Sequence, residues 1–338
     1  MEVRTFVFKR LVLLLPILFG LLLLVFVISR VVPADPVALL AGPMAGREQV
    51  EALRHQLGLD RSLYAQFLSY LAQLGKGDLG ASLYSNRPVV EDLRVRFPAT
   101  MELTLVAMTL AVGLGIPLGT IAALRRNSKI DKGLTVFSVG GLSIASFWLG
   151  LMCQLFFGMY LDLLPIGGRI TGTPPANVTG FYLVDSLITG NLSALWSSVV
   201  HLLLPGLTLS MPAIATVMRF TRSGVLDCLQ RDYVVYERAM GLPERVVVIK
   251  YVLRNALNAT IAQIGLIFGA LLAGTVAIET VFDWPGLGLY AVSSILLFDY
   301  KAILGVTLIS GIAYVVVNLG VDILLVILDP RGIRQQGA

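Results

Sequence analysis

Four carboxylates stand inside or beside long apolar stretches of the 338-residue chain: Glu102, Glu279, Asp283 and Asp322. An ionisable group in hydrocarbon costs at least about 2.5–3.5 kcal/mol on insertion scales, so it normally faces protein or water. Carboxylates placed in this way could relay protons, as in a proton-coupled carrier. Alternatively, they could bond neighbouring helices or backbone and hold a helical bundle together. The residues by themselves leave both interpretations open.

Other side chains offer little material for catalysis or metal binding. The two cysteines, Cys153 and Cys228, and the two histidines, His55 and His201, are too few for a disulfide framework or a metal cluster. No H-E-x-x-H pair occurs, and no G-x-x-x-x-G-K-[ST] phosphate loop occurs either. We therefore expect no catalytic residue, no metal site and no nucleotide site of this kind in the chain.

The composition is that of a membrane protein. Apolar residues make up 56% of the chain and charged residues only 14%, which leaves too little polar surface for a soluble globule. The formal net charge is +5, but the basic residues are dispersed between apolar blocks. A nucleic-acid partner would require them on one soluble face, so we expect none.

Six apolar runs are long enough to cross about 30 Å of hydrocarbon, which takes about 20 helical residues. The predicted spans are Leu11–Val32, Met101–Leu124, Leu134–Leu164, Val199–Met218, Ala259–Val281 and Ala302–Leu328. The apolar core of the first run is too long for a cleavable signal peptide. In the second run, Ala111, Gly113, Gly115 and Gly119 surround Pro117 and would let a neighbouring helix approach closely.

The distribution of Lys and Arg predicts the orientation in the membrane, because cytoplasmic loops retain positive charge. Basic residues exceed acidic ones at the N-terminus and in the loops 125–132 and 219–254, whereas the intervening loops are neutral or acidic. Both termini should therefore be cytoplasmic. The predicted divisions are 1–32 for the N-terminus and first span, 33–100 for a periplasmic helical segment, 101–328 for the transmembrane core and 329–338 for a cytoplasmic tail.

The loop at about 225–257 is the longest charged and periodic stretch. Helical spacing places five residues on one predicted face: Val225, Leu229, Tyr233, Tyr236 and Met240. Gly241 predicts a helix stop, since glycine takes the left-handed conformation at little cost. After Pro243, a second predicted helix carries Val246, Ile249, Leu253 and Leu257 on one side. Such apolar faces could cover the chain's own spans or fill a groove on a cytoplasmic partner.

Specific motifs add a family resemblance. The run "DYVVYERAMGL" from Asp232, with "LRNAL" from Leu253, resembles the cytoplasmic EAA loop of binding-protein-dependent ABC importer permeases, in particular the dipeptide, oligopeptide and nickel branch. Further matches follow in the family's order: "RVVPADPV" from Arg30, "LGLD" from Leu57, "GDLGASL" from Gly77, "FPATMELTL" from Phe97, "LPIGGR" from Leu164, "ETVFDWPGLG" from Glu279 and "VNLGVDILLVILDPR" from Val317. Val235 stands where the broader family has its Glu, and Ser146 replaces a usual proline.

The resemblance implies an all-α, six-span subunit with the type I importer fold in a bacterial inner membrane. It implies that the EAA helix docks on an ATPase subunit through Tyr233, Tyr236, Glu237, Arg238, Ala239, Met240, Gly241 and Leu242. The implied partners are a second homologous permease subunit, two ATP-binding subunits that hold ATP and Mg, and a periplasmic solute-binding protein.

The cargo implied by the resemblance is a di- or oligopeptide. Nickel complexes, glutathione and opine-like compounds remain open. An alternative of another class is a self-sufficient channel or ion-coupled carrier that uses Glu102 or Asp322, and a membrane-embedded enzyme is a third.

Overall fold

The structure, a computed structural model, describes residues 12, 16–27, 46–56 and 60–328. Within these ranges the regular structure is helical, apart from one isolated β-bridge between Ala81 and Pro88. The elements are α3 (Arg47–Gln56), α4 (Leu63–Leu74), α5 (Val89–Leu124), α6 (Lys129–Ser143), α7 (Ser146–Cys153), the π-helix η1 (Gln154–Tyr160), α8 (Tyr182–Ile188), α9 (Leu192–Leu229), α10 (Asp232–Ala239), α11 (Glu244–Val246), the π-helix η2 (Val247–Leu253), α12 (Arg254–Val281), α13 (Leu287–Leu296) and α14 (Tyr300–Leu328). A further helix covers Pro16–Val27.

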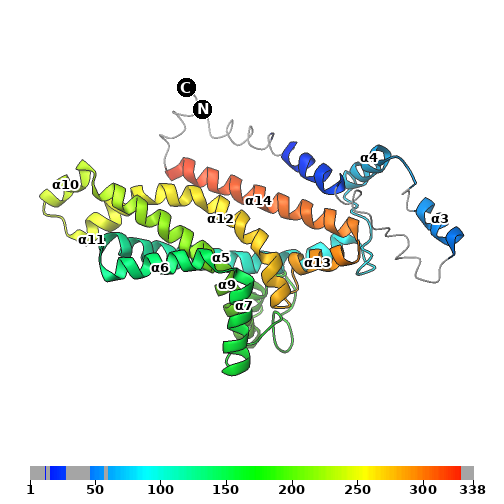
Figure 1. The fold of residues 1–338 in the computed structure, drawn as a ribbon, viewed down its shortest axis with the longest axis horizontal. Coiled ribbons are helices and arrows are strands. Elements are labelled where there is room, and N and C mark those ends of the chain that lie inside the picture. The colour runs from blue at the N-terminus through cyan, green and yellow to red at the C-terminus, as the bar shows by residue number, and fades with distance from the viewer. Residues whose placement is uncertain (1–11, 13–15, 28–45, 57–59, 329–338) are drawn as a thin grey trace.

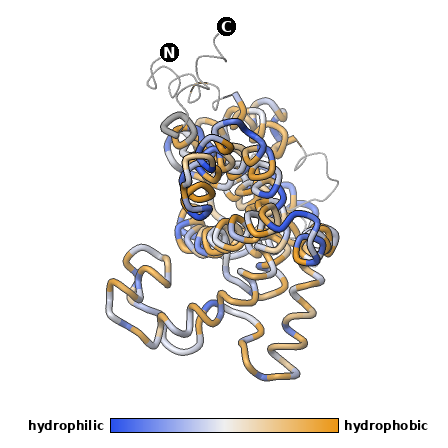
Figure 2. The backbone as a smooth tube through the Cα atoms, turned by 90° about the vertical axis from the view of Figure 1, so that its left-hand side faces the viewer, coloured by the Kyte–Doolittle hydropathy of each residue, from blue (hydrophilic) through white to orange (hydrophobic). Residues whose placement is uncertain are grey.

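Among the described residues, four helices are long and apolar enough to cross a membrane: α5, α9, the continuous helix Glu244–Val281 formed by α11, η2 and α12, and Tyr300–Leu324 of α14. They run roughly side by side along the long axis of the molecule (Figure 1). Apolar residues cover much of their length and also the segment that projects from the bundle (Figure 2). These four helices contain the second, fourth, fifth and most of the sixth predicted spans.

Small residues hold α5 and α9 together. A Cβ added at Gly115 would come within 2.7 Å of the Val217 side chain, and one at Gly119 within 2.5 Å of the Met218 carbonyl oxygen. The backbones therefore approach more closely than any larger residue permits. Ala111 is buried in the same interface, whereas Gly113 faces open space. The prediction of a close-packing face is confirmed for three of the four small residues.

The third predicted span is not one straight helix. It consists of Lys129–Ser143 and Ser146–Tyr160, which meet at an angle of 101°. Ile144 and Ala145 adopt extended backbone conformations at the bend, with ψ values of 125° and 126°. A hydropathy pattern reports only how apolar a run is, so Leu134–Leu164 carries no signal for the change of direction. α7 leaves the bundle nearly at right angles to α6 (Figure 1).

The first predicted span is described only over Pro16–Val27, and the rest of Leu11–Val32, apart from Val12, lies outside the described residues. Phe26 on this helix packs against Phe67 of α4, with ring centroids 5.1 Å apart. Leu304 of α14 belongs to the same buried cluster. The segment 33–100 is thus joined to the bundle by apolar contacts, and its last twelve residues already belong to α5, which begins at Val89.

Candidate functional site: a helical hairpin and a buried polar network

The loop predicted from its periodicity forms a helical hairpin at one end of the bundle (Figure 1). We call residues 231–250, which contain α10, α11 and the first half of η2, the α10–α11 hairpin. Gly241 has φ +78°, and its N–H donates to the Arg238 carbonyl, while the Leu242 N–H donates to the Glu237 carbonyl. This pair of bonds is the Schellman motif that ends a helix at a left-handed glycine. The predicted helix stop at Gly241 is confirmed.

The predicted single apolar face from Val225 to Met240 is wrong. α9 ends at Leu229 and α10 begins at Asp232, so the helical register is interrupted between them. Val225 is buried and Tyr233 is half-buried, but Met240 is 65% exposed. The residue spacing predicts a common face only if the helix is unbroken, and here it is broken.

The predicted face of the second helix is also displaced. Val248, Val252 and Ala256 are buried, whereas Val246 is 38% and Ile249 is 67% exposed. The reason is η2, because a π-helix closes i→i+5 hydrogen bonds and rotates the following side chains away from a 3.6-residue pattern. Val252 and Ala256 form one small core with Val225, Val234 and Val247, which fixes the hairpin to the ends of α9 and α12.

The predicted coupling residues separate into two groups. Tyr233, Glu237 and Leu242 are half-buried. Tyr233 and Leu242 pack on the hairpin's own core. The exposed group is Tyr236, Arg238, Ala239, Met240 and Gly241, and Tyr236 is 63% exposed. The hairpin therefore presents large apolar side chains to its surroundings, and these include Val235 at 61% exposed.

An exposed ion pair closes the turn of the hairpin. The Arg238 guanidinium donates to both carboxylate oxygens of Glu244, over 3.2 Å from Nε and 2.5 Å from Nη2. The hydrogen bond to Glu244 raises the pKa of Arg238 above its ordinary value. Side chains this exposed (44% and 56%) contribute little to stability, since such pairs are worth about 0–1 kcal/mol.

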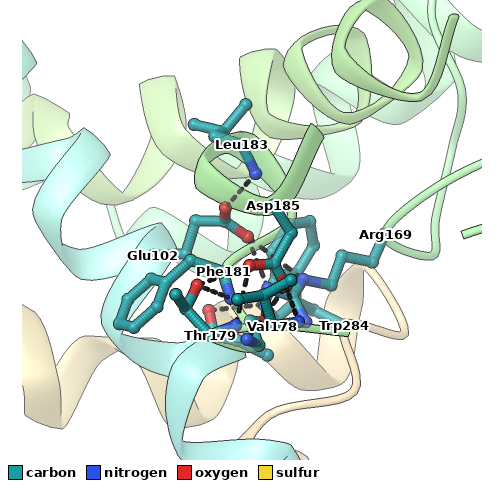
Figure 3. Close-up of polar contacts among 10 residues, drawn as sticks. Glu102, Arg169, Val178, Thr179, Phe181, Leu183, Asp185 and Trp284 are labelled. Carbon is teal, nitrogen blue, oxygen red and sulfur yellow. Dashed lines mark hydrogen bonds and ion pairs between the residues drawn. The ribbon is translucent and has the colours of Figure 1, made fainter. Parts of the chain in front are cut away.

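A polar network lies away from the hairpin, where α5, α8 and the loop 161–181 meet. Glu102 on α5 accepts from Arg169 Nε at 3.1 Å and Nη2 at 2.6 Å, and its other oxygen accepts from the Leu183 N–H at 2.7 Å. Arg169 also donates to the Gly180 carbonyl and stacks over the Tyr182 ring at 3.7 Å. Figure 3 shows these groups converging on the Glu102 carboxylate.

Asp185 organises the adjoining loop. Its carboxylate accepts from the backbone N–H groups of Val178, Thr179 and Gly180 and from the Thr179 hydroxyl (Figure 3). Burial opposes ionisation of Asp185, but the hydroxyl and the three N–H donors outweigh it and hold the pKa of this carboxyl below its ordinary value. The turn that carries Gly180, and hence the carbonyl that receives Arg169, is fixed by this one side chain.

Glu279 joins the end of α12 to α5 and α13. It is fully buried and accepts from the Thr100 hydroxyl at 2.6 Å and from the N–H groups of Gly288 and Leu289 at 2.6 and 3.1 Å. Trp284 Nε1 donates to the Ala99 carbonyl at 3.0 Å. Glu102 and Glu279 are thus brought to the same part of α5, and both are bonded internally, as the structural interpretation of these acids required.

The other two predicted acids lie elsewhere. Asp283 is exposed, next to the Glu279 cluster, in a turn with φ +48°. Asp322 is half-buried on α14. Among the residues that the structure describes, no three His, Cys, Asp or Glu side chains form a cluster that could hold a metal ion.

Sequence reasoning missed several buried polar residues that hold these elements together: Arg169, Asp185, Trp284, Asp92, Tyr290 and Asp299. Asp299 is fully buried and accepts from the Ser82 hydroxyl and the Leu83 N–H, each at 2.6 Å. A usable signal existed for Arg169, which is the only Lys or Arg between Lys132 and Arg219. A single basic residue in an outer loop and a single acidic residue in a span favour an ion pair between the two.

Comparison with known proteins completes the assignment. Residues 115–334 match the family model "Binding-protein-dependent transport system inner membrane component", and residues 3–104 match "Binding-prot-dependent transport system membrane comp, N-term". The chain is 45% identical over 314 residues, 92% of each protein, to the probable D,D-dipeptide transport system permease protein DdpB of Escherichia coli K12.

Two further relatives are similar over nearly their full length. The chain is 39% identical over 336 residues to the di/tripeptide transport system permease protein DppB of Pseudomonas aeruginosa UCBPP-PA14, covering 98% of this chain and 99% of the relative. It is 38% identical over 325 residues to the glutathione transport system permease protein GsiC of Escherichia coli O6:H1, covering 96% and 97%. The protein belongs to the family of inner membrane components of binding-protein-dependent transport systems and is a permease subunit rather than an ATPase.

Proposed function

We propose that this permease forms the translocation path for di- and oligopeptides that a periplasmic binding protein delivers. Two of the relatives above are named for dipeptide or di/tripeptide transport and one for glutathione, itself a small peptide. A peptide is therefore the cargo class that these relatives have in common. Nickel complexes are the cargo of none of the three.

The proposed membrane arrangement has six spans with both termini in the cytoplasm. Four long helices, the bent pair Lys129–Tyr160 and the helix Pro16–Val27 supply six apolar elements in the order of the predicted spans. The excess of basic residues in the loop 219–254 supports a cytoplasmic position for the α10–α11 hairpin. The Glu102–Arg169 network then lies toward the periplasm.

The observation that carries the proposed mechanism is the exposed apolar surface of the α10–α11 hairpin. Tyr236 and Met240 are more than 60% exposed, although the hairpin buries its own core of valines behind them. Exposed apolar side chains grouped on a rigid element are typical of a protein interface. The occupant we propose is the cleft of an ATP-binding subunit, whose nucleotide-driven closure would move the hairpin.

The proposed assembly contains this chain, a second homologous permease subunit, two ATP-binding subunits and the binding protein. ATP and Mg would be held by the ATP-binding subunits. An ion-coupled carrier would need an ionisable group on the path, but the Glu102 carboxylate is already bonded by Arg169 and Leu183. The internal bonding of Glu102 favours a structural role over proton transfer.

The test combines assembly and transport. We expect the double substitution Tyr236→Asp and Met240→Asp to abolish co-purification of the ATP-binding subunits and ATP-dependent uptake of a labelled dialanine by proteoliposomes. The unfolding temperature of the isolated permease should change little, because both side chains are exposed. The matched control is Leu63→Asp on α4, which is 58% exposed at the opposite end.

Uptake that persists without ATP, or that survives the double substitution, would contradict the coupling proposal. If the unsubstituted importer hydrolyses ATP in response to the binding protein but takes up no dialanine, only the peptide cargo is contradicted.

A further inference from the structure

A partly open hollow of ≈ 120 Å³ lies between α7, α9 and α12. Its walls are mainly apolar, with Leu209 and Ala213 from α9 and Ile267 and Leu271 from α12. Among the described residues that line it, none is charged.

In the six-span arrangement proposed above, the hollow lies at about the middle of the membrane. Its α9 residues fall near the centre of the 38-residue helix Leu192–Leu229, and its α12 residues fall near the centre of the predicted span Ala259–Val281. The α6–α7 bend, whose Ser146 lines the hollow, lies about 22 Å along α6 from Lys129 at 1.5 Å per residue. This distance places the bend inside the hydrocarbon layer.

The bend indicates that the hollow is on a hydrated path rather than against lipid. Irregular backbone at membrane depth is tolerated only where it is buried in protein or lines a water-filled cavity. Ile144 is 41% exposed and Ala145 is exposed as well, so in this chain by itself the bend is not buried in protein. In the assembled importer, the side of the hollow next to Ser146 would therefore open onto a hydrated path or contact the second permease subunit, and the test below separates these two arrangements.

Size and polarity limit what the hollow can accept. An apolar cavity of about 150 Å³ accommodates benzene, so this one suits a single small or medium side chain. A charged group would find no partner among the described lining residues and would bear a large desolvation cost. Thr216 adds one polar contact, because its hydroxyl donates to the Pro212 carbonyl and retains oxygen lone pairs that can accept an N–H.

We propose that this hollow is a side-chain subsite of the translocation path, which receives an uncharged side chain of the peptide while Thr216 accepts an amide N–H. The proposal rests on the proposed function, since it needs a peptide cargo. It assigns selectivity for side-chain size to the permease, in addition to any selection by the binding protein.

Filling the hollow is the direct test. Ala270 on α12 lines it and is exposed, so Ala270→Leu adds volume there without disturbing the buried core. In proteoliposomes of the complete importer, we expect ATP-dependent uptake of dileucine to fall at least about tenfold relative to uptake of dialanine, because single methylene groups in apolar pockets discriminate by about 10–200-fold. The matched control, Ala273→Leu, changes an exposed residue of the same helix outside the hollow and should leave the ratio unchanged.

Thr216→Val supplies a second measurement that does not depend on added volume. It should lower uptake of dialanine and dileucine by the same factor, since every dipeptide carries the amide N–H. Unchanged uptake of both peptides by both variants would overturn the proposal. So would loss of ATP hydrolysis stimulated by the binding protein in both variants but not in Ala273→Leu, because the hollow would then be a packing surface for the second permease subunit.

The failure of the proposed function has a different signature. If the unsubstituted importer hydrolyses ATP in response to its binding protein but takes up neither dialanine nor dileucine, the peptide cargo is wrong. An unchanged uptake ratio in an importer that transports both peptides rejects only the subsite.

Discussion

The α10–α11 hairpin and the Glu102–Arg169 network use charged and apolar residues in opposite ways. In the network, an ion pair is buried to 3–6% exposure and bonded to its own chain. In the hairpin, Tyr236 and Met240 are more than 60% exposed and the ion pair Arg238–Glu244 is open to solvent. An exposed apolar group gains free energy from covering by a partner, whereas a buried and fully bonded charge does not. The comparison therefore separates the hairpin surface that we propose for docking from a region that holds the fold.

The largest effect should come from breaking the buried pair. Glu102→Ala leaves the Arg169 guanidinium in the interior without its carboxylate, and removal of one member of a buried pair costs about 3–5 kcal/mol. Thermal unfolding of the purified permease in detergent measures this loss. The double variant Glu102→Leu, Arg169→Met should be more stable than Glu102→Ala, and a double variant of equal or lower stability would contradict the view that the unpaired charge is the cost.

Asp185→Asn should be the next most destabilising substitution of the network. Its carboxylate accepts four hydrogen bonds, and a hydrogen bond to a charged group contributes about 1.5–3 kcal/mol net to stability. We expect a loss of this order in the free energy of unfolding at neutral pH.

The pH dependence of Asp185 has a defined sign. Because the folded-state pKa is lowered, its stabilisation is present above the unfolded pKa of about 3.9 and is lost as the pH falls through the folded value. Unfolding followed from pH 7 to pH 3 should show this loss in the unsubstituted protein and a smaller one in Asp185→Asn. Equal pH profiles for the unsubstituted protein and Asp185→Asn would show that Asp185 is not responsible for the loss of stability at low pH.

Gly241→Val tests the hairpin rather than the network. A left-handed conformation costs a residue with a Cβ about 1–2 kcal/mol, and open space around Gly241 means that no clash adds to this. We expect normal membrane insertion but loss of ATP-dependent uptake, measured in proteoliposomes. Gly241→Asn is the control, since asparagine tolerates this conformation best, and normal uptake by the valine variant would contradict the coupling role.

The smallest effect should come from Glu244→Gln. Both partners of the Arg238 pair are about half exposed, so the substitution should change the free energy of unfolding by less than about 1 kcal/mol. A loss comparable to that of Glu102→Ala would break the contrast between the two regions. Raising the salt concentration should remove what difference there is.

Much of the helical architecture could be predicted from hydropathy and helix signals. The apolar runs located four long helices, and Gly241 marked the end of a helix, where it adopts a left-handed φ. The two hairpin faces were misplaced, because the break at Gln230–Arg231 and the π-helix η2 both change register without a strong local signal. The 101° bend at Ile144–Ala145 was missed because hydropathy reports how apolar a run is and not its direction.

The amino-acid sequence determined that this chain belongs in lipid, where its long helices lie and which residues carry the family motifs, because composition, run length and motif order are local properties. Only the tertiary structure decided that Glu102 meets Arg169, that Glu279 bonds α5 and α13, and that Met240 faces outward while Val234 faces inward. These outcomes depend on segments separated by tens to hundreds of residues, and a helix can rotate about its axis by changing a single turn. Contacts across that distance are set by packing and hydrogen bonding, which no periodicity along one helix records.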